Sequence, residues 1–566
     1  MLRRLILPLA LLAASCTTAT APRRPALAPA PGMVSAADPR AVRAGVEILD
    51  AGGSAADAAI ATAIALTVVE PQSSGIGGGG FIVHHDAKSG RTTSFDGREE
   101  APSAAGPDWF IGPDGKPMPI AEAIPGGKSV GVPGNLRMMA LAHRRHGKLS
   151  WERLFEPAIR LARDGFAITP RLHQALSSYS RSAALSAWGR SQFYDAAGAA
   201  KPVGTVLRNP ELAAFLEQLA ARGPDWFYTG ANAEELVRTV NQAPRNPSRM
   251  AVGDLATYDG KERMSVCGTY RVYRICGMGP PSSGGTTVFA ILKQLERFDM
   301  AAYRPDDPRA WHLIGDSMRL AYADREAYLG DPGYVSVPVA GLMNEEYLKS
   351  RGALIDPARA LAKAEAGTPP GARRATAGLD TEVPGTSHMV AVDREGNVAS
   401  FTSTIESAFG SGLTMHGFFL NNELTDFSMI AARDGMPVAN RVEGGKRPRS
   451  SMSPTIVYNP DGSVRIAIGA AGGTTIIAQV AKALIGVLDW NLSAQDAIAL
   501  PVMIGIGEDL RVERGTALER MAPALTAMGH RVVPVEPGFK ANAIERVGAR
   551  WVGAADPRSE GVAVSQ

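Results

Sequence analysis

Residues 384–404 read PGTSHMVAVDREGNVASFTST and have the pattern of a β-hairpin. Two runs of strand-forming residues flank a turn at 393–397, which has a common hairpin loop length and contains a glycine. A register that is symmetric about this turn places Thr386 opposite Thr404, so that the two hydroxyls face each other across the strand pair. Because threonine is common in strands, the hairpin alone favours an ordinary pair of strand threonines.

The chain changes character at this hairpin. Residues 351–385 are rich in Ala, Gly, Pro and Arg and lack apolar periodicity, which indicates a mobile surface segment. The sequence that follows is rich in strand-forming runs: HMVAVD, NVASFTST, FFLNN, SPTIVYN and VRIAIG. A linker between two domains is the simplest interpretation of this change.

The region before the hairpin is mainly helical. Apolar spacing predicts helices over 38–51, 54–69 and 151–164, the last ending at Gly165. Between them lies the glycine run SSGIGGGGF at 73–81, followed by the strand pair FIVHHD and RTTSFD. The run lacks the Gly-Lys-Ser/Thr ending of a phosphate-binding loop, so we interpret it as close backbone packing within a sheet.

The composition is that of an ordinary globular protein. The chain has 566 residues, of which 45% are hydrophobic and 20% are charged, and its formal net charge is +3. No run of Lys or Arg forms a basic patch, which argues against a nucleic-acid partner. No apolar run is long enough for a transmembrane helix.

Residues 1–16 have the features of an export signal. They combine a charged start, an apolar run at 5–12 that is too short to span a bilayer, and small residues directly before Cys16. This pattern favours a bacterial lipoprotein with a lipid on Cys16, held at a membrane in the periplasm. Plain cleavage with periplasmic or secreted release stays open. Residues 17–32 are rich in Ala and Pro and predict an extended tether.

Two further cysteines, Cys267 and Cys276, lie in the strand-like segment MSVCGTYRVYRICGM. They could face each other across a hairpin and form a disulfide in an oxidising compartment, and two unpaired thiols are an equal alternative. Metal binding is disfavoured because two cysteines without a nearby histidine provide too few ligands.

From about residue 33 to its end, the chain resembles the γ-glutamyltransferase family of N-terminal-nucleophile hydrolases. The resemblance rests on a series of long motifs in the family's order: GGSAADAAIA (52–61), SGIGGGGF (74–81), DGREEAP (96–102), PPSSGG (280–285), GTSHMVAVD (385–393), NNELTDF (421–427), KRPRSSMSPTIV (446–457) and GAAGG (469–473). It implies an α+β fold, a four-layer αββα sandwich with two antiparallel sheets face to face.

The resemblance also implies that the chain cuts itself between Gly385 and Thr386. The large subunit would be 33–385 and the small subunit 386–566, and the two would share one domain. The Thr386 hydroxyl attacks the preceding carbonyl, and the amine released by the cut then serves as the base for that hydroxyl. A flexible segment before the cut would let the new chain end move out of the site.

The remaining site residues follow from the positions of the family's motifs. Thr404 would polarise the nucleophile, and the backbone N–H groups of Gly472 and Gly473 would form the oxyanion hole. A substrate with an α-amino-acid head group needs both signs of charge. The residues expected to bind its carboxylate are Arg98, Ser450 and Ser451, and those expected to bind its ammonium group are Glu406, Glu423 and Asp426.

The implied activity is cleavage of γ-glutamyl amides such as glutathione, with transfer to water or to an amino acid or peptide. No metal or organic cofactor is implied. A glutaryl-type cephalosporin acylase of the same family is the alternative, and a non-catalytic exported γ-glutamyl-peptide-binding lipoprotein is a more distant one. The segment 428–449 is short compared with family members that carry a lid, which predicts a more open donor site.

Overall fold

The computed structural model describes residues 30–373, 376–378, 385–536 and 538–566. The expected export signal, Cys16 and most of the predicted tether lie outside the described residues. The last tether residues, 30–32, belong to the fold, because the backbone N–H of Gln566 donates to the Gly32 carbonyl at 2.8 Å. In the described ranges no helix combines the length and apolar character that a membrane-spanning segment needs.

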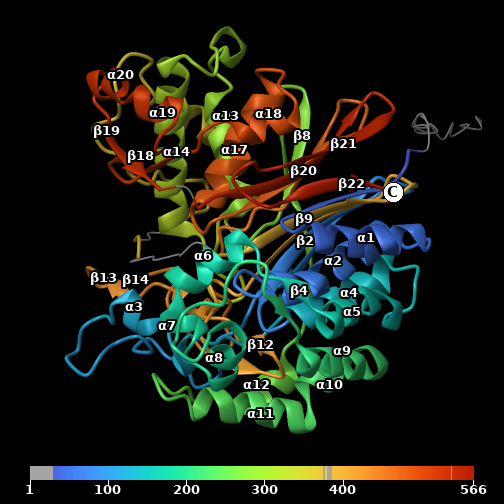
Figure 1. The fold of residues 1–566 in the computed structure, drawn as a ribbon. Helices are drawn as coiled ribbons and strands as arrows, with labels where there is room; N and C mark the ends of the chain where they lie inside the picture. The colour runs from blue at the N-terminus through green and yellow to red at the C-terminus, as the bar shows by residue number, and fades with distance from the viewer. Residues whose placement is uncertain (1–29, 374–375, 379–384, 537) are drawn as a thin grey trace, which may run out of the picture.

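Two antiparallel sheets form the centre of the protein (Figure 1). The first sheet has the strand order β22 (Val562–Ser565), β1 (Met33–Ala36), β9 (Ser387–Val392), β10 (Val398–Thr404), β2 (Gly79–Asp86), β3 (Arg91–Gly97) and β6 (Lys261–Met264). The second has the order β21 (Arg550–Ala555), β20 (Lys540–Val547), β16 (Val464–Ala471), β15 (Thr455–Tyr458), β8 (Tyr273–Gly277) and β7 (Val266–Tyr270). Each sheet combines strands from before and after residue 386.

The sheets pack face to face and helices cover both outer surfaces. Strands β9 and β10 contact β16 and β20 across the interior. Helices of one outer layer pack on the first sheet: α1 (Pro39–Asp50), α2 (Ala55–Val69) and α4 (Asn135–His146), with α5 (Glu156–Asp164) behind α2. Helices of the other pack on the second: α13 (Gly284–Leu295), α17 (Thr475–Leu488) and α18 (Ala494–Ala499), with α14 (Pro308–Tyr328) behind α13. This confirms the predicted αββα sandwich.

Further helices extend the first outer layer. They include α6 (Pro170–Ser178), α9 (Pro210–Arg222) and α11 (Gly230–Asn241). A smaller sheet beside α14 contains β17 (Met503–Ile506), β18 (Asp509–Glu513) and β19 (Arg531–Val535), with α20 (Ala522–Ala527) next to it. Both additions lie outside the central sandwich.

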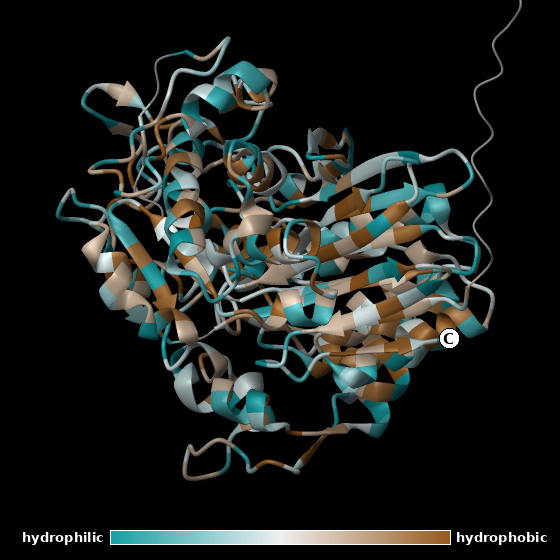
Figure 2. Ribbon diagram, turned by 90° about the horizontal axis from the view of Figure 1, so that it is seen from above, coloured by the Kyte–Doolittle hydropathy of each residue, from teal (hydrophilic) through white to brown (hydrophobic). Residues whose placement is uncertain are grey.

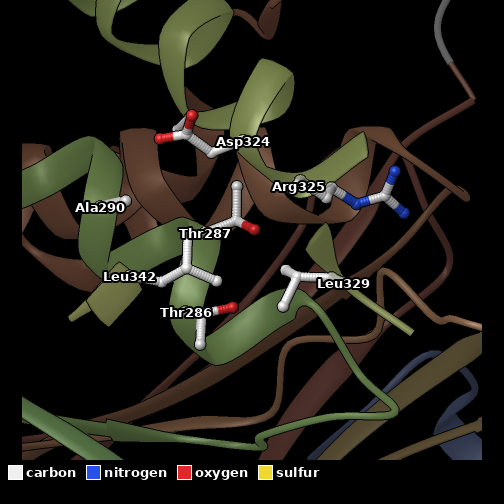
Figure 3. A pocket seen from close by; sticks show the side chains of 8 residues that line it. Thr286, Thr287, Ala290, Asp324, Arg325, Leu329 and Leu342 are labelled. Atoms are coloured by element: carbon white, nitrogen blue, oxygen red, sulfur yellow. The ribbon is translucent and has the colours of Figure 1, made fainter. Parts of the chain in front are cut away.

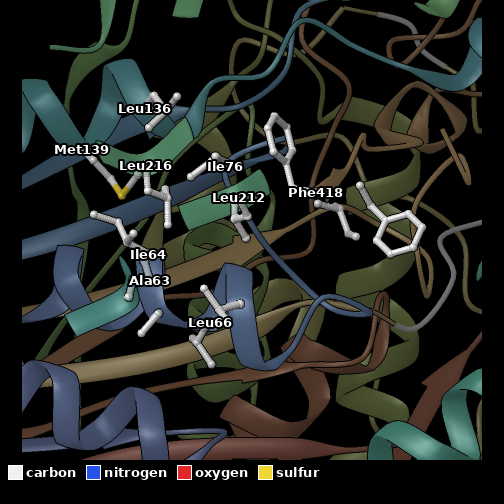
Figure 4. Packing of buried hydrophobic residues seen from close by; sticks show 14 of the residues in the cluster. Ala63, Ile64, Leu66, Ile76, Leu136, Met139, Leu212, Leu216 and Phe418 are labelled. Atoms are coloured by element: carbon white, nitrogen blue, oxygen red, sulfur yellow. The ribbon is translucent and has the colours of Figure 1, made fainter. Parts of the chain in front are cut away.

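The hydrophobic core has two main parts, one on each side of the first sheet. Along β9, Met389 and Ala391 belong to the core with α2, whereas Val390 and Val392 belong to the core between the sheets. Because both faces are buried, apolar residues recur along the central strands (Figure 2). In the first core, side chains of α2 such as Ile64 meet those of α4 and α9 (Figure 4).

The predicted hairpin register is confirmed. Ser387 pairs with Ser403 and Val392 with Val398, a symmetric register that continues to Thr386 and Thr404. The glycine run is also packed as predicted. An added Cβ at Gly78 would lie 1.9 Å from the Thr404 carbonyl oxygen, and one at Gly77 would lie 2.2 Å from that of Phe419. Only glycine allows the chain to approach the end of β10 this closely.

Two local expectations need correction. The segment 151–164 is not one helix: a 3₁₀ turn, Glu152–Leu154, precedes α5, because Pro157 lacks an N–H and therefore starts a new helix. Residues 351–373 are also not a loosely attached surface segment. The Leu361 N–H donates to Asp316 and the Gly367 N–H donates to Asp324, at 2.9 and 2.7 Å, so this part of the chain is held against α14.

Cys267 and Cys276 form a disulfide across the β7–β8 hairpin, where they are paired residues. This settles the choice between a disulfide and two thiols.

We predict that replacing both cysteines by serine lowers the free energy of unfolding by about 2–3 kcal/mol, because the crosslink closes a short loop in the unfolded chain. Urea denaturation of the wild type with and without a reducing agent should show the same loss. The double variant serves as the control and should not respond to the reductant. A wild type whose stability is unchanged by reduction would contradict the pairing.

Candidate active site

Thr386 and Thr404 lie together at the open end of the β9–β10 hairpin. Their Oγ1 atoms are 3.0 Å apart, and Thr404 Oγ1 also accepts a hydrogen bond from the Glu406 backbone N–H at 2.8 Å. The Thr386 N–H donates to the Ser73 carbonyl at 3.0 Å. Both threonine side chains are buried. The predicted hydroxyl pair is therefore present, and the hydrogen bond to Ser73 of the glycine-rich segment holds the Thr386 backbone in place.

The bond before Thr386 is crowded and strained. The backbone φ of Thr386 is +80°, in the left-handed region that a β-branched residue rarely adopts. An added Cβ at Gly385 would lie 1.6 Å from the Glu406 carbonyl oxygen, so this position needs glycine. Such a conformation costs on the order of 1–3 kcal/mol and persists only where the surroundings enforce it.

Gly472 and Gly473 connect the end of β16 to α17. Their φ values, +133° and +59°, are ones that glycine adopts readily. The preceding residue, Ala471, pairs with Lys540 of β20, and the Lys540 amine lies 3.3 Å from Ser387 Oγ. This pairing brings the glycines and the start of β9 to the same end of the sandwich, next to the N-terminus of α17.

Acidic residues from three segments surround Arg98, the residue that follows β3. Its guanidinium forms ion pairs with Glu423 and Asp426, both in the 3₁₀ turn Glu423–Asp426, and lies 3.9 Å from Glu99. It also donates to the carbonyls of Pro448 and Arg449, at 3.0 and 2.9 Å. Glu406 joins this group, because one carboxylate oxygen each of Glu406, Glu423 and Asp426 lies within 4.8 Å of the others.

The charges in this buried cluster are not balanced. Burial raises the pKa of Asp426 to about 6, although Arg98 opposes the shift. Burial and the neighbouring Glu423 raise the pKa of Glu99 well above its usual range. Burial alone would lower the pKa of Arg98, but Glu423 and Asp426 outweigh it and raise that pKa. An additional cation would therefore be stabilised here.

A metal ion and an organic ammonium group are the two kinds of cation to consider. Three carboxylates could ligate a metal, but the guanidinium of Arg98 already contacts two of them and would repel a divalent ion. A second potential ligand set joins His312 and Asp316 of α14 with His530. In this set both Asp316 oxygens already accept hydrogen bonds, from Arg319 and from the Leu361 backbone N–H, so they are poorly placed to ligate a metal. Neither set is therefore a good metal site.

The predicted serine pair is held by a residue that the sequence analysis missed. Arg325 of α14 donates to Ser451 Oγ at 2.7 Å and to Ser283 Oγ at 2.8 Å. Ser283, from the PPSSGG motif, donates in turn to the Ser450 carbonyl at 2.7 Å. Arg98 reaches the backbone just before the pair, not its hydroxyls. No local pattern marks Arg325, because its role depends on contacts between distant segments.

The residues of the expected donor site are buried in this structure, and a site more open than in family members with a lid stays a prediction. Arg98 and Glu423 are 0% exposed and Asp426 is 3% exposed. The short segment 428–449 folds back over the cluster, because Asn440 donates to the Asp426 carbonyl at 2.7 Å and accepts from the Arg449 N–H at 2.9 Å.

A separate pocket lies between α13 and α14 and does not include the threonine pair. Figure 3 shows Thr286 and Thr287 from α13 near Asp324, with the Arg325 guanidinium directed away from Asp324. Asp324 is already bonded to Tyr347 and to the Gly367 N–H. The pocket is therefore behind the serine pair and is not the reaction site.

An αββα sandwich with a threonine at the start of a central strand defines the class of N-terminal-nucleophile hydrolases. Comparison with known proteins makes the assignment specific. The profile of the family described as gamma-glutamyltranspeptidase matches residues 41–566, and the chain belongs to this family.

Two curated relatives and one solved structure illustrate the range of the family. The glutathione hydrolase proenzyme of Bacillus subtilis is 36% identical over 94% of this chain and 91% of its own length. The acylase ACY 1 proenzyme of a Pseudomonas species is 33% identical over 94% of this chain and 93% of its own. The structure of a cephalosporin acylase from Bacillus halodurans superposes with a TM-score of 0.82 at 26% identity, over 98% of this chain and 99% of its own.

The buried ion pairs of Arg98 lead to a prediction about stability. Replacing Arg98 by Met leaves Glu99, Glu423 and Asp426 buried without their cation, so we expect a loss of about 3–5 kcal/mol at pH 8. Without the guanidinium the folded-state pKa values of these acids rise further, so the folded protein binds more protons than the unfolded chain. The stability of the variant then falls as pH rises, so its loss relative to the wild type should be smaller at pH 5 than at pH 8.

Chemical denaturation of both proteins at pH 5 and pH 8 measures this difference. Arg98→Lys keeps the charge and should lose less than Arg98→Met at pH 8. An equal loss for Arg98→Met at the two pH values would mean that the acids do not depend on Arg98.

Proposed function

We propose that this protein is a self-processing threonine amidohydrolase that cleaves γ-glutamyl amides such as glutathione. The observation that carries the proposal is the Thr386–Thr404 hydroxyl pair at the end of a central hairpin, 3.0 Å between oxygens. A set of charged residues that fits an amino-acid head group accompanies it. The family membership and the relatives named as glutathione hydrolases support the same activity.

Maturation begins at the Gly385–Thr386 bond. Thr386 Oγ1 attacks the Gly385 carbonyl carbon, the C–N bond breaks as the proton moves to the nitrogen, and water hydrolyses the resulting ester. The products are a large segment that ends at Gly385 and the small segment 386–566, which stay together because each sheet contains strands of both. The positive φ at Thr386 favours this step, since the strained torsion disappears when the bond is cut.

The cut creates the base that catalysis needs. The free α-amine of Thr386 takes the hydroxyl proton as Oγ1 attacks the γ-carbonyl of the substrate, and it then gives that proton to the leaving amine. Thr404 orients the hydroxyl. The N–H groups of Gly472 and Gly473 stabilise the oxyanion, where one such donor contributes roughly 3–4 kcal/mol. Water or an acceptor amine then releases the γ-glutamyl group from the enzyme ester.

The substrate head group would exchange partners with the buried ion pairs. Its carboxylate takes the guanidinium of Arg98 together with the Ser450–Ser451 segment, and its ammonium takes Glu406, Glu423 and Asp426. Each charge in the cluster thus finds a new partner, which keeps the desolvation cost low. A glutaryl group has no ammonium, so the acidic residues favour γ-glutamyl amides over the acylase alternative.

In this proposal the mature enzyme lies in the periplasm, attached by a lipid at Cys16 or released after plain cleavage. The charged start and the apolar run at 5–12 support export. Acceptor amino acids or peptides would reach it there without crossing the inner membrane.

Two anilides with the same leaving group test the substrate class. We expect γ-glutamyl p-nitroanilide to be hydrolysed with a kcat/KM at least about 10-fold above that of glutaryl p-nitroanilide, because a charge-assisted hydrogen bond contributes about 1.5–3 kcal/mol. Asp426→Asn should reduce this ratio, and the KM for the γ-glutamyl substrate should rise below a pH of about 6, where Asp426 becomes protonated. The KM for the glutaryl substrate should not follow this change.

The outcome that overturns the γ-glutamyl assignment is a preference ratio that stays the same in Asp426→Asn and in Glu423→Gln. A wild type that prefers the glutaryl substrate would establish the acylase activity instead.

A further inference from the structure

A buried lysine–glutamate pair lies beside Thr386. Lys540 begins β20, and Glu70 is the residue that follows α2, so the pair joins two different layers of the sandwich. The Lys540 Nζ atom is 2.9 Å from Glu70 Oε2 and 3.1 Å from Oε1. Both side chains are more than nine-tenths buried, at 2% and 3% exposure. The motifs that indicated the activity include neither residue.

The same two side chains hold the residues on either side of the Thr386 nitrogen. Lys540 Nζ lies 3.1 Å from Ser73 Oγ and 3.3 Å from Ser387 Oγ, and Ser387 Oγ donates to Glu70 Oε2 at 2.6 Å. Ser73 is the residue whose carbonyl accepts the Thr386 N–H at 3.0 Å. Ser387 is the next residue along the chain. The lysine and glutamate therefore fix the nitrogen from both sides.

We propose that Lys540 is a positioning residue for the reaction at Thr386. With Glu70 it fixes the place of the Thr386 nitrogen, and its positive charge keeps the amine unprotonated after the cut, so that the amine can accept the hydroxyl proton. The second part rests on the proposed function, because it needs Thr386 to be the nucleophile. The first part concerns the uncut chain as well.

The charged groups around this nitrogen come from several elements. Glu70 follows α2, Lys540 lies on β20, and Arg171 of α6 has its Nε 3.8 Å from Glu70 Oε1. Asp38, before α1, is bonded to Arg40. Glu560 accepts a hydrogen bond from the Arg171 backbone N–H at 3.1 Å. Lys540 and Arg171 both face Glu70, and a neighbouring positive charge disfavours a further ammonium group.

The titration of the pair agrees with this arrangement. Burial lowers the pKa of Lys540 to about 8, with Glu70 opposing the shift. Burial would raise the pKa of Glu70, but Lys540 and Arg171 outweigh it and lower that pKa. At neutral pH the pair is therefore mainly ionised. An ordinary α-amine has a pKa of about 7.7–8.0, so a modest lowering of this pKa leaves most of the Thr386 amine unprotonated at neutral pH.

Removing the lysine should move the pH profile in a defined direction. In Lys540→Met the Thr386 α-amine loses a neighbouring positive charge, so its pKa rises. The Thr386 amine must be unprotonated to act as the base, so kcat falls at low pH as the amine becomes protonated. This fall, the acid limb of the pH profile, therefore moves to higher pH. We expect a shift of about 0.5–1 pH unit and a fall in kcat of about 10- to 100-fold at pH 7, with KM changed less than about 3-fold.

Lys482 provides a matched control. It is also a buried lysine, on α17, and its Nζ donates to the carbonyls of Ala497, Ile498 and Leu500 at 2.6–3.0 Å. Burial lowers its pKa to about 7. Lys482→Met removes a buried amine of similar kind away from Thr386, so it should lower thermal stability without moving the acid limb.

The experiment compares the full-length wild type, Lys540→Met, Lys540→Arg and Lys482→Met. The measurements are melting temperature, the time course of cleavage before Thr386, and the pH profile of γ-glutamyl p-nitroanilide hydrolysis. The expected result is a shifted acid limb in Lys540→Met, partial recovery in Lys540→Arg and no shift in Lys482→Met. An unshifted limb in a processed Lys540→Met, or the same shift in Lys482→Met, would overturn the proposal.

Two further outcomes are also decisive. If Lys540→Met melts like the wild type but is not cut, and Lys540→Arg is cut, the positioning role is supported directly in the uncut chain. If neither variant folds, Glu70→Gln decides: with Lys540 retained, its acid limb should move to lower pH, and a shift to higher pH would refute the proposal. A wild type that is cut but inactive on the anilide contradicts the proposed function and leaves the cleavage result valid.

Discussion

The structure depends on how the backbone at Thr386 is held. One carbonyl, that of Ser73, accepts the N–H of Thr386, and one hydroxyl, that of Thr404, lies 3.0 Å from its side chain. The glycine run before β2 makes this possible, because Gly78 packs directly on the Thr404 carbonyl. Thr386 is thus placed by two segments, the glycine run at 73–81 and the end of β10. A strained φ at Thr386 is the consequence of that placement.

Buried charge is the second constraint, and it separates the site into two regions. Around Arg98 the carboxylates outnumber the cation, which suits a ligand that brings its own ammonium group. Around Glu70, Lys540 and Arg171 supply positive charge, which suits a neutral amine at Thr386. The surroundings of Arg98 and of Glu70 therefore differ in their electrostatics within one buried region. Neither arrangement would be stable in an apolar core without its hydrogen bonds.

The sequence predicts local features well and long-range contacts poorly. The symmetric hairpin turn was enough to predict the Thr386–Thr404 pair, and family motifs indicated the αββα layers. Arg325, which holds Ser451, could not be predicted, because nothing in a helical sequence shows which distant loop it meets. The same holds for Lys540 and Glu70. Burial of the acidic cluster could not be predicted either, since it depends on the Asn440 contacts and not on the length of the segment.

The central claim is that Thr386 becomes an N-terminal nucleophile by cutting its own chain. The most direct measurement is the mass and N-terminal sequence of the purified protein beside a Thr386→Ala variant. The account predicts two fragments from the wild type, the smaller beginning Thr-Ser-His, and a single chain from the variant. An uncut wild type, or an identical cut in the variant, would contradict it.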